Sequence, residues 1–95
     1  MAFLPLDGPT VEDEISVTTT PQELKVGASA LEERKVITFE AQDGRVRWGF
    51  TNSITSSKGF IGFKNQLTTI EASTMQSVWI VAETGTVTVF FAERA

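Results

Sequence analysis

Apolar and polar residues alternate in short segments along the chain, and no window of eleven or more residues carries a helical stripe. Side chains two positions apart in a strand share one face, so this period predicts β-strands. The alternation is clearest at 15–19, 35–41 and 46–50, and two almost continuously apolar segments follow at 78–82 and 87–91. Branched and aromatic side chains, which suit a pleated surface, are frequent, and threonine occurs thirteen times. The chain is therefore predicted to be all-β.

Turn-forming residues separate these segments at intervals of about 8 to 12 residues, a spacing typical of sandwiches and small barrels. Asp43-Gly44 predicts a hairpin between 35–41 and 46–50, because glycine readily adopts positive φ. Gly59 and Gly62 likewise indicate a turn within "SKGFIGFK". The segment "SALEERK" is too short for an independent helix and is predicted to be a loop. The expected fold is a small β-sandwich or jelly-roll-like barrel of about seven or eight antiparallel strands.

The alternation also predicts the core. In 35–41, Ile37 and Phe39 share one face, whereas in 46–50 the aromatic residues share a face opposite the two arginines. Apolar residues at nearly every position of 78–82 and 87–91 indicate that a second layer or another subunit covers the outer face of these strands. The full expected core consists of Ile15, Val17, Leu24, Ile37, Phe39, Val46, Trp48, Phe50, Leu67, Ile80, Val87 and Val89.

Residues 1–13 are expected to form an extended amino-terminal arm, and residues 14–95 a single domain. The first fourteen residues carry only acidic charged side chains, whereas the remaining 81 carry eight acidic and eight basic groups. The net charge of −4 is thus a feature of the amino terminus. A neutral domain argues against a large phosphate-binding surface.

No apolar run approaches the roughly 18 residues that span a bilayer, and the first residues lack the basic segment of a signal peptide. The protein is expected to be made and used without export, and no membrane partner is expected. Cysteine and histidine are absent, which excludes disulfides, Cys/His zinc sites and the usual nucleophile–base pairs. Glu32 and Glu33 are adjacent and point in different directions, and no other carboxylate pair is indicated. We therefore expect no enzyme activity, no catalytic residue, no metal and no cofactor.

A basic and aromatic stretch raises the possibility of nucleic-acid binding. "GRVRWGF" followed by "SKGFIGFK" resembles the cold-shock domain, a small barrel that stacks bases on aromatic side chains between cationic groups. The family's two stacking aromatic residues are separated by one residue, whereas Phe60 and Phe63 are three apart and are expected on opposite faces. Trp48 also precedes Lys58 by ten residues, about twice the family's gap. A cold-shock or OB-like binder of single-stranded nucleic acid is therefore kept as an alternative that the spacing disfavours.

A second resemblance extends from about Thr18 to Glu93. The order "TPQEL", "ERKVITFEAQDG", "VRWGFTNSITSSKGFIGFKNQLTTIEA" and "SVWIVAETGTVTVFFAE" resembles that of small β-sandwich virion proteins of tailed bacteriophages. Those proteins run from a threonine-rich strand through an Arg-Lys strand and a Ser/Thr-rich loop into a Gly-Phe motif, and end after a "TGTV" turn. The matching positions are Arg34, Lys35, Gly49, Ser56 to Phe60, Gln66, Leu67, Trp79 and Thr84 to Val87.

This resemblance implies a non-enzymatic structural protein of the virion, assembled in the host cytoplasm. The expected function is that of a capsid decoration or cement protein that binds the major capsid protein, or other virion proteins, in many copies. Modest contacts then add through avidity in a homo-oligomer or symmetric array. A neck, tail or baseplate component is the alternative within this class. The residues expected to anchor protein contacts are Phe3, Leu4 and Leu6 in the arm, Lys58 and Lys64 on a loop, and Trp79 and Phe90 on strand faces away from the core.

Overall fold

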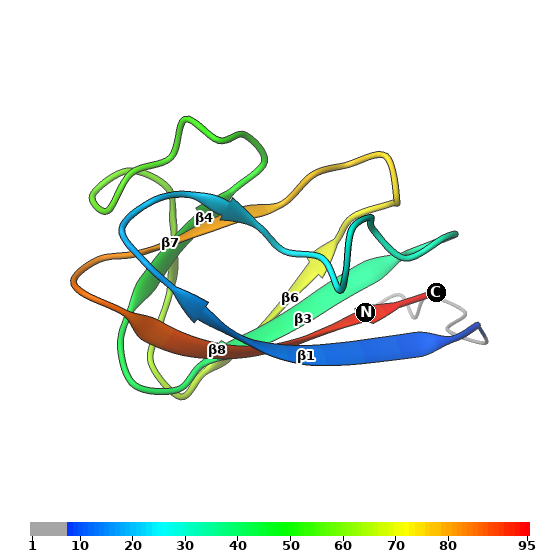
Figure 1. Ribbon diagram of the computed structural model, residues 1–95, viewed down its shortest axis with the longest axis horizontal. Helices are drawn as coiled ribbons and strands as arrows, with labels where there is room; N and C mark the ends of the chain where they lie inside the picture. Colours follow the sequence, from blue (N-terminus) through cyan, green and yellow to red (C-terminus); the bar gives the residue numbers. More distant parts are fainter. Residues whose placement is uncertain (1–7) are drawn as a thin grey trace.

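Two antiparallel four-stranded sheets pack face to face in the computed structural model, which describes residues 8–95 (Figure 1). Sheet A contains, in spatial order, β1 (Thr10–Val17), β8 (Val87–Arg94), β3 (Val36–Ala41) and β6 (Leu67–Glu71). Sheet B contains β2 (Gln22–Glu23), β7 (Trp79–Ala82), β4 (Val46–Gly49) and β5 (Phe60–Gly62). The described residues form no helix, so the predicted all-β sandwich is confirmed, and the sheets do not close into a barrel.

Short connections fix how the two sheets lie relative to each other. Residues 18–21 link β1 to β2, and residues 63–66 link β5 to β6. Each link joins the edge strand of one sheet to the edge strand of the other. The sandwich therefore has a β1/β2 edge on one side and a β5/β6 edge on the opposite side.

The first strand starts earlier than the sequence pattern indicates. Thr10 pairs with Arg94 and Val17 pairs with Val87, so β1 accompanies β8 along its whole length. Backbone hydrogen bonds between Ala95 and both Gly8 and Pro9 extend this pairing. The expected boundary after residue 13 thus lies inside a strand. The acidic side chains that indicated a solvated arm stay exposed to solvent here, because β1 is an edge strand. The predicted anchors Phe3, Leu4 and Leu6 lie outside the described residues.

The predicted hairpin at Asp43-Gly44 is wrong. β3 pairs with β6 and β8, whereas β4 pairs with β5 and β7, so this turn crosses from one sheet to the other. The Asp43 carboxylate accepts a 2.7 Å hydrogen bond from the Thr88 amide, and the Gln42 amide donates to the Thr88 carbonyl. A turn signal specifies a local reversal of the chain, and it does not specify whether the second strand returns in the same layer.

The core lies between the inner faces of the two sheets. Most of the expected core side chains are buried there, and Ile15 and Trp48 are partly buried against them. Two expected members are wrong: Phe50 is 40% exposed and Leu67 is 65% exposed. Ile70 of β6 pairs with Ile37, which directs Ile70 inwards and Leu67, three positions away, outwards. Phe50 lies just beyond the end of β4, where the opposite sheet no longer covers it.

Gly62 is a packing requirement of β5 and not a turn residue. A Cβ atom at Gly62 would lie 2.8 Å from Val46 Cγ2 and 2.9 Å from Phe39 Cε1. Only glycine therefore allows the two sheets to approach this closely. Gly59, by contrast, has a φ of +144°, and the predicted conformational freedom is used there.

One ion pair is completely buried. Arg34 Nη1 lies 2.7 Å from Glu93 Oε1, and both side chains have no exposed surface. Three further guanidinium N–H groups donate to the carbonyls of Ala72, Ser73 and Gln76, and the carboxylate accepts hydrogen bonds from the amides of Val26 and Leu31. The pair thereby joins β8 to two long connections, and among the described residues no buried side-chain polar atom lacks a partner.

Candidate interaction surfaces

The described residues do not gather potential metal ligands at one place. Residues 8–95 contain no group of three or more carboxylate, histidine or cysteine side chains that could hold a metal ion. Their buried charges, Arg34 and Glu93, use their polar atoms to bond one another and the backbone, which gives them a structural role. None of these residues belongs to a helix long and apolar enough to cross a membrane. Exposed side chains on the outer faces and edges of the two sheets form the candidate interaction surfaces.

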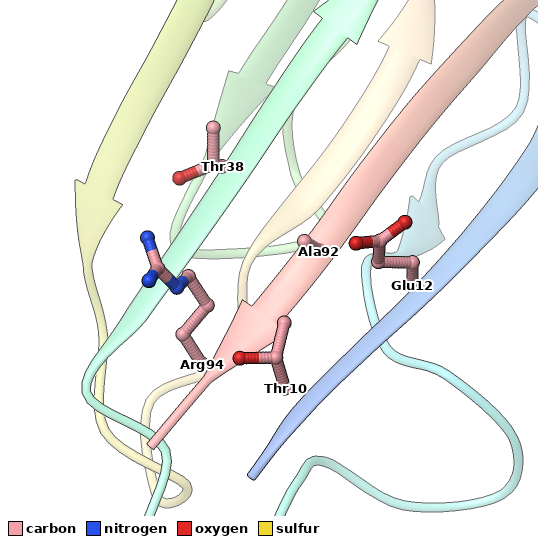
Figure 2. A pocket seen from close by; sticks show the side chains of 5 residues that line it. All are labelled: Thr10, Glu12, Thr38, Ala92 and Arg94. Carbon is pink, nitrogen blue, oxygen red and sulfur yellow. The ribbon is translucent and has the colours of Figure 1, made fainter. Parts of the chain in front are cut away.

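The outer face of sheet A contains a hollow of about 420 Å³ (Figure 2). Its lining comes from three adjacent strands: Thr10 and Glu12 of β1, Ala92 and Arg94 of β8, and Thr38 of β3. The small Ala92 side chain pairs with both Glu12 and Thr38, so the face is lowest there, between Glu12 on one side and Arg94 on the other. One carboxylate and one guanidinium thus line the hollow.

Phe90 lies on this outer face, on the side away from the core as predicted. It is 39% exposed and pairs with Glu14 on one side and Glu40 on the other. Leu67 completes the row because it pairs with Glu40. Two apolar side chains thus alternate with two carboxylates across the sheet.

Trp79 lies on the opposite side of the molecule from Phe90. It pairs with Glu23 and Gly49 in sheet B and points away from the core side chain Ile80. Trp79 therefore lies on the strand face away from the core, as predicted, but it is partly buried. The sequence brings Trp79 and Phe90 close along the chain, but β7 and β8 belong to different sheets, so the two cannot form one surface.

Lys58 and Lys64 are exposed and flank β5 on its two sides in the sequence. Lys58 closes a tight turn in which its backbone amide and carbonyl both bond Thr55. Lys64 lies in the link between β5 and β6, where its backbone forms a parallel bridge with Ala41. The structure therefore places both predicted lysines at the β5/β6 edge.

The same edge carries an exposed apolar cluster. Trp48 stacks against Phe60 with ring centroids 4.8 Å apart, and against the edge of Phe50 at 5.6 Å. Phe60, at 58% exposure, is more exposed than Ile61 and Gly62, the other two residues of β5. The large exposed hydrophobic residues on or beside this edge are Phe50, Phe60, Ile61, Phe63 and Leu67.

Sequence reasoning missed this cluster as a surface. It assigned Phe50 and Leu67 to the core, and it expected Phe60 and Phe63 on opposite faces, with a turn at Gly59 and Gly62. The density of aromatic residues in "GRVRWGF" and "SKGFIGFK" suggested a stacking surface only as an alternative, because the sequence does not show that β5 is a short edge strand whose inner face is uncovered.

Glu83 forms a charged cluster with two arginines on the outer face of sheet B. Its carboxylate oxygens lie 2.7 Å from Arg45 Nε and 2.7 Å from Arg47 Nε, and Arg47 also donates to the Gly59 carbonyl. The hydrogen bond from Arg45 lowers the pKa of the Glu83 carboxyl, partial desolvation opposes this, and the bond from Arg47 lowers it further. Because Arg45 is 48% exposed, solvent screens the cluster and its contribution to stability is modest.

The lowered pKa of Glu83 predicts a pH-dependent contribution to stability. A carboxylate whose pKa is depressed by folding stabilises the folded state above its unfolded pKa, near 4.5, and loses this contribution as the pH falls through the folded value. The difference in unfolding free energy between wild type and Glu83→Gln should therefore be largest near neutral pH and shrink in acid. Urea titrations at several pH values measure it. A difference that grows as the pH falls contradicts the assignment.

No protein-family model, curated protein or solved structure gives a significant match to this chain.

Proposed function

We propose that this chain is a non-enzymatic structural protein of a bacteriophage particle, and specifically a capsid decoration or cement protein. It binds the shell in many copies through side-chain contacts, and repeated modest contacts add through avidity. The major capsid protein is the partner of the outer face of sheet A. A neck, tail or baseplate position is the alternative within the same class.

The observation that carries this proposal is the row of Phe90 and Leu67 on the outer face of sheet A. Exposed hydrophobic side chains at 39% and 65%, interleaved with Glu14 and Glu40, form a surface that an apolar and basic protein patch complements. The adjacent hollow adds a carboxylate and a guanidinium for orientation. The buried charges, in contrast, bond one another and the backbone, which supports a role through contact rather than through chemistry. The order of motifs from Thr18 to Glu93 adds the resemblance to phage virion proteins.

A co-sedimentation experiment tests the proposal. Purified protein is mixed with heads or tails of the phage that encodes it, from particles grown without this gene product, and the bound fraction is measured. Wild type should sediment with heads. Phe90→Ser should lower the bound fraction at least about tenfold, because a partly buried hydrophobic anchor is lost at every copy. The matched control is Thr88→Ser on the same face of the same strand, which should bind as wild type.

Two further outcomes of this experiment are decisive. Binding to tails and not to heads replaces the decoration function with the tail alternative, and binding to neither rejects the proposal.

A deletion tests the predicted arm anchors Phe3, Leu4 and Leu6, and it must stop at residue 7 because Thr10 to Asp13 pair with β8. Unchanged head binding by the deleted protein removes the arm from the contact.

The nucleic-acid alternative is favoured by one observation, the exposed Phe60 ring beside Trp48, with Lys58 two residues away. The two rings meet at an interplanar angle of 37° and contact each other, so they do not form a flat platform for bases. Titration with a single-stranded oligonucleotide at increasing salt separates the functions, because phosphate contacts weaken as salt rises. Salt-sensitive binding to the oligonucleotide, with no binding to heads, establishes the alternative.

A further inference from the structure

The two edges of the sandwich differ in charge. At the β1/β2 edge, β1 is an eight-residue edge strand that carries Glu12, Asp13 and Glu14 in succession, all of them exposed. At the β5/β6 edge, Lys58 and Lys64 flank β5, and Phe60 and Leu67 are exposed between and beside them. Within residues 8–95, no ion pair engages Glu12, Glu14, Lys58 or Lys64. Both edges therefore keep their charge available for an outside partner.

An edge strand has unpaired N–H and C=O groups that can hydrogen-bond to a strand of another chain, and charged side chains on the edge determine which strands can pair with it. Two β1 edges that meet would place carboxylates opposite carboxylates, and two β5/β6 edges would place lysines near lysines. Like charges in such positions are destabilising, so contacts between identical edges are disfavoured. The carboxylates of β1 and the lysines beside β5, in contrast, are complementary. Glu40 lies on the inner strand β3, and Glu71 ends β6, at the opposite end of that strand from Lys64, so neither adjoins Lys64 along the edge.

We propose that copies of this chain bind one another head to tail, with the acidic β1/β2 edge of one copy against the apolar and basic β5/β6 edge of the next. Each contact pairs Glu12 and Glu14 with Lys58 and Lys64 of the neighbour. Phe60 is covered by the same contact, which removes exposed apolar surface from water. Because the two edges lie on opposite sides of the sandwich, two bound copies still have one free edge of each kind, and further copies can add.

A contact between two different surfaces is heterologous, so it produces either a closed ring or an open filament. The contact uses Glu12 and Glu14 at the border of the outer face of sheet A, and it leaves Phe90 of that face uncovered. The inference therefore goes beyond the proposed function and requires only the purified chain. Self-association is measured without heads, and Phe90→Ser, which leaves both edges unchanged, tests head binding separately, so the two proposals can fail independently.

Charge reversal tests the inference. Glu12→Lys/Glu14→Lys makes both edges basic, and Lys58→Glu/Lys64→Glu makes both edges acidic. Wild type should sediment as an oligomer in sedimentation velocity, and each variant alone should associate at least about tenfold more weakly, because its edges now repel. An equimolar mixture of the two variants should recover the oligomer, because each basic edge meets an acidic edge. All four positions are exposed, and circular dichroism of each variant verifies that it is folded.

A charge-matched control is available in the loop before β3. Glu32→Lys/Glu33→Lys changes the net charge as much as the β1 variant but lies at neither edge, and it should associate as wild type. Three results overturn the proposal: a wild type that is monomeric at every concentration, a reversed variant that associates as wild type by itself, or a mixture that stays monomeric.

Discussion

Replacing Arg34 with methionine is expected to destabilise the folded state by about 3 to 5 kcal/mol, because it leaves Glu93 as a buried charge without its partner. The same change removes the donors that satisfy the carbonyls of Ala72, Ser73 and Gln76. A domain of this size has a total stability on the order of 5 to 15 kcal/mol, so the variant should be close to unfolded at moderate temperature. Urea unfolding followed by tryptophan fluorescence measures the loss.

Two control variants separate burial from charge. Arg45→Met breaks a contact to Glu83 at the same 2.7 Å distance on the surface, and it should cost no more than about 1 kcal/mol. Arg34→Met/Glu93→Leu removes both buried charges and should recover part of the loss, though not the part that comes from the unpaired carbonyls. A cost for Arg34→Met that does not exceed that of Arg45→Met would show that the pair does not hold the connections to β8.

The pair illustrates what the sequence could not predict. Arg34 and Glu93 are 59 residues apart, and each is an ordinary charged residue near the end of a strand. Local patterns reveal which face of a segment is apolar, and they identified Ile37 and Phe39 as inner residues of β3 correctly. Local patterns carry no information on which residues distant in sequence contact that segment, because those contacts depend on how the two sheets stack.

The same limit explains the errors at Asp43-Gly44 and Leu67. Both depended on which strand lies beside which, and the strand order β1-β8-β3-β6 joins strands that are far apart in sequence. Leu67 lies in a segment where Thr68 and Ile70 share the other face, so composition alone allowed either orientation. The predicted contact residues met the same difficulty. Lys58 and Lys64 share one edge, but Trp79 and Phe90 lie on opposite faces because a sheet crossing separates them.

The pair of adjacent phenylalanines in β8 gives the sharpest test of the register. Phe91 is 1% exposed and pairs with Phe39 on the inner face, whereas Phe90 is 39% exposed on the outer face. Phe91→Ala is therefore expected to cost about 3 to 5 kcal/mol, the combined loss of burial and of packing around the cavity that it leaves. Phe90→Ala, with the same chemical change one residue away, should cost less than half as much.

Urea titrations of both variants measure the difference, and the free energy that separates them reports the register directly. A shift of β8 by one residue would exchange the two faces along the whole strand, because side chains alternate with a period of two. It would bring Phe90 into the core and expose Glu93, which is buried against Arg34. Equal costs for the two variants, or a larger cost for Phe90→Ala, would contradict the arrangement of sheet A. They would also remove Phe90 from the outer face on which the proposed contact with the shell depends.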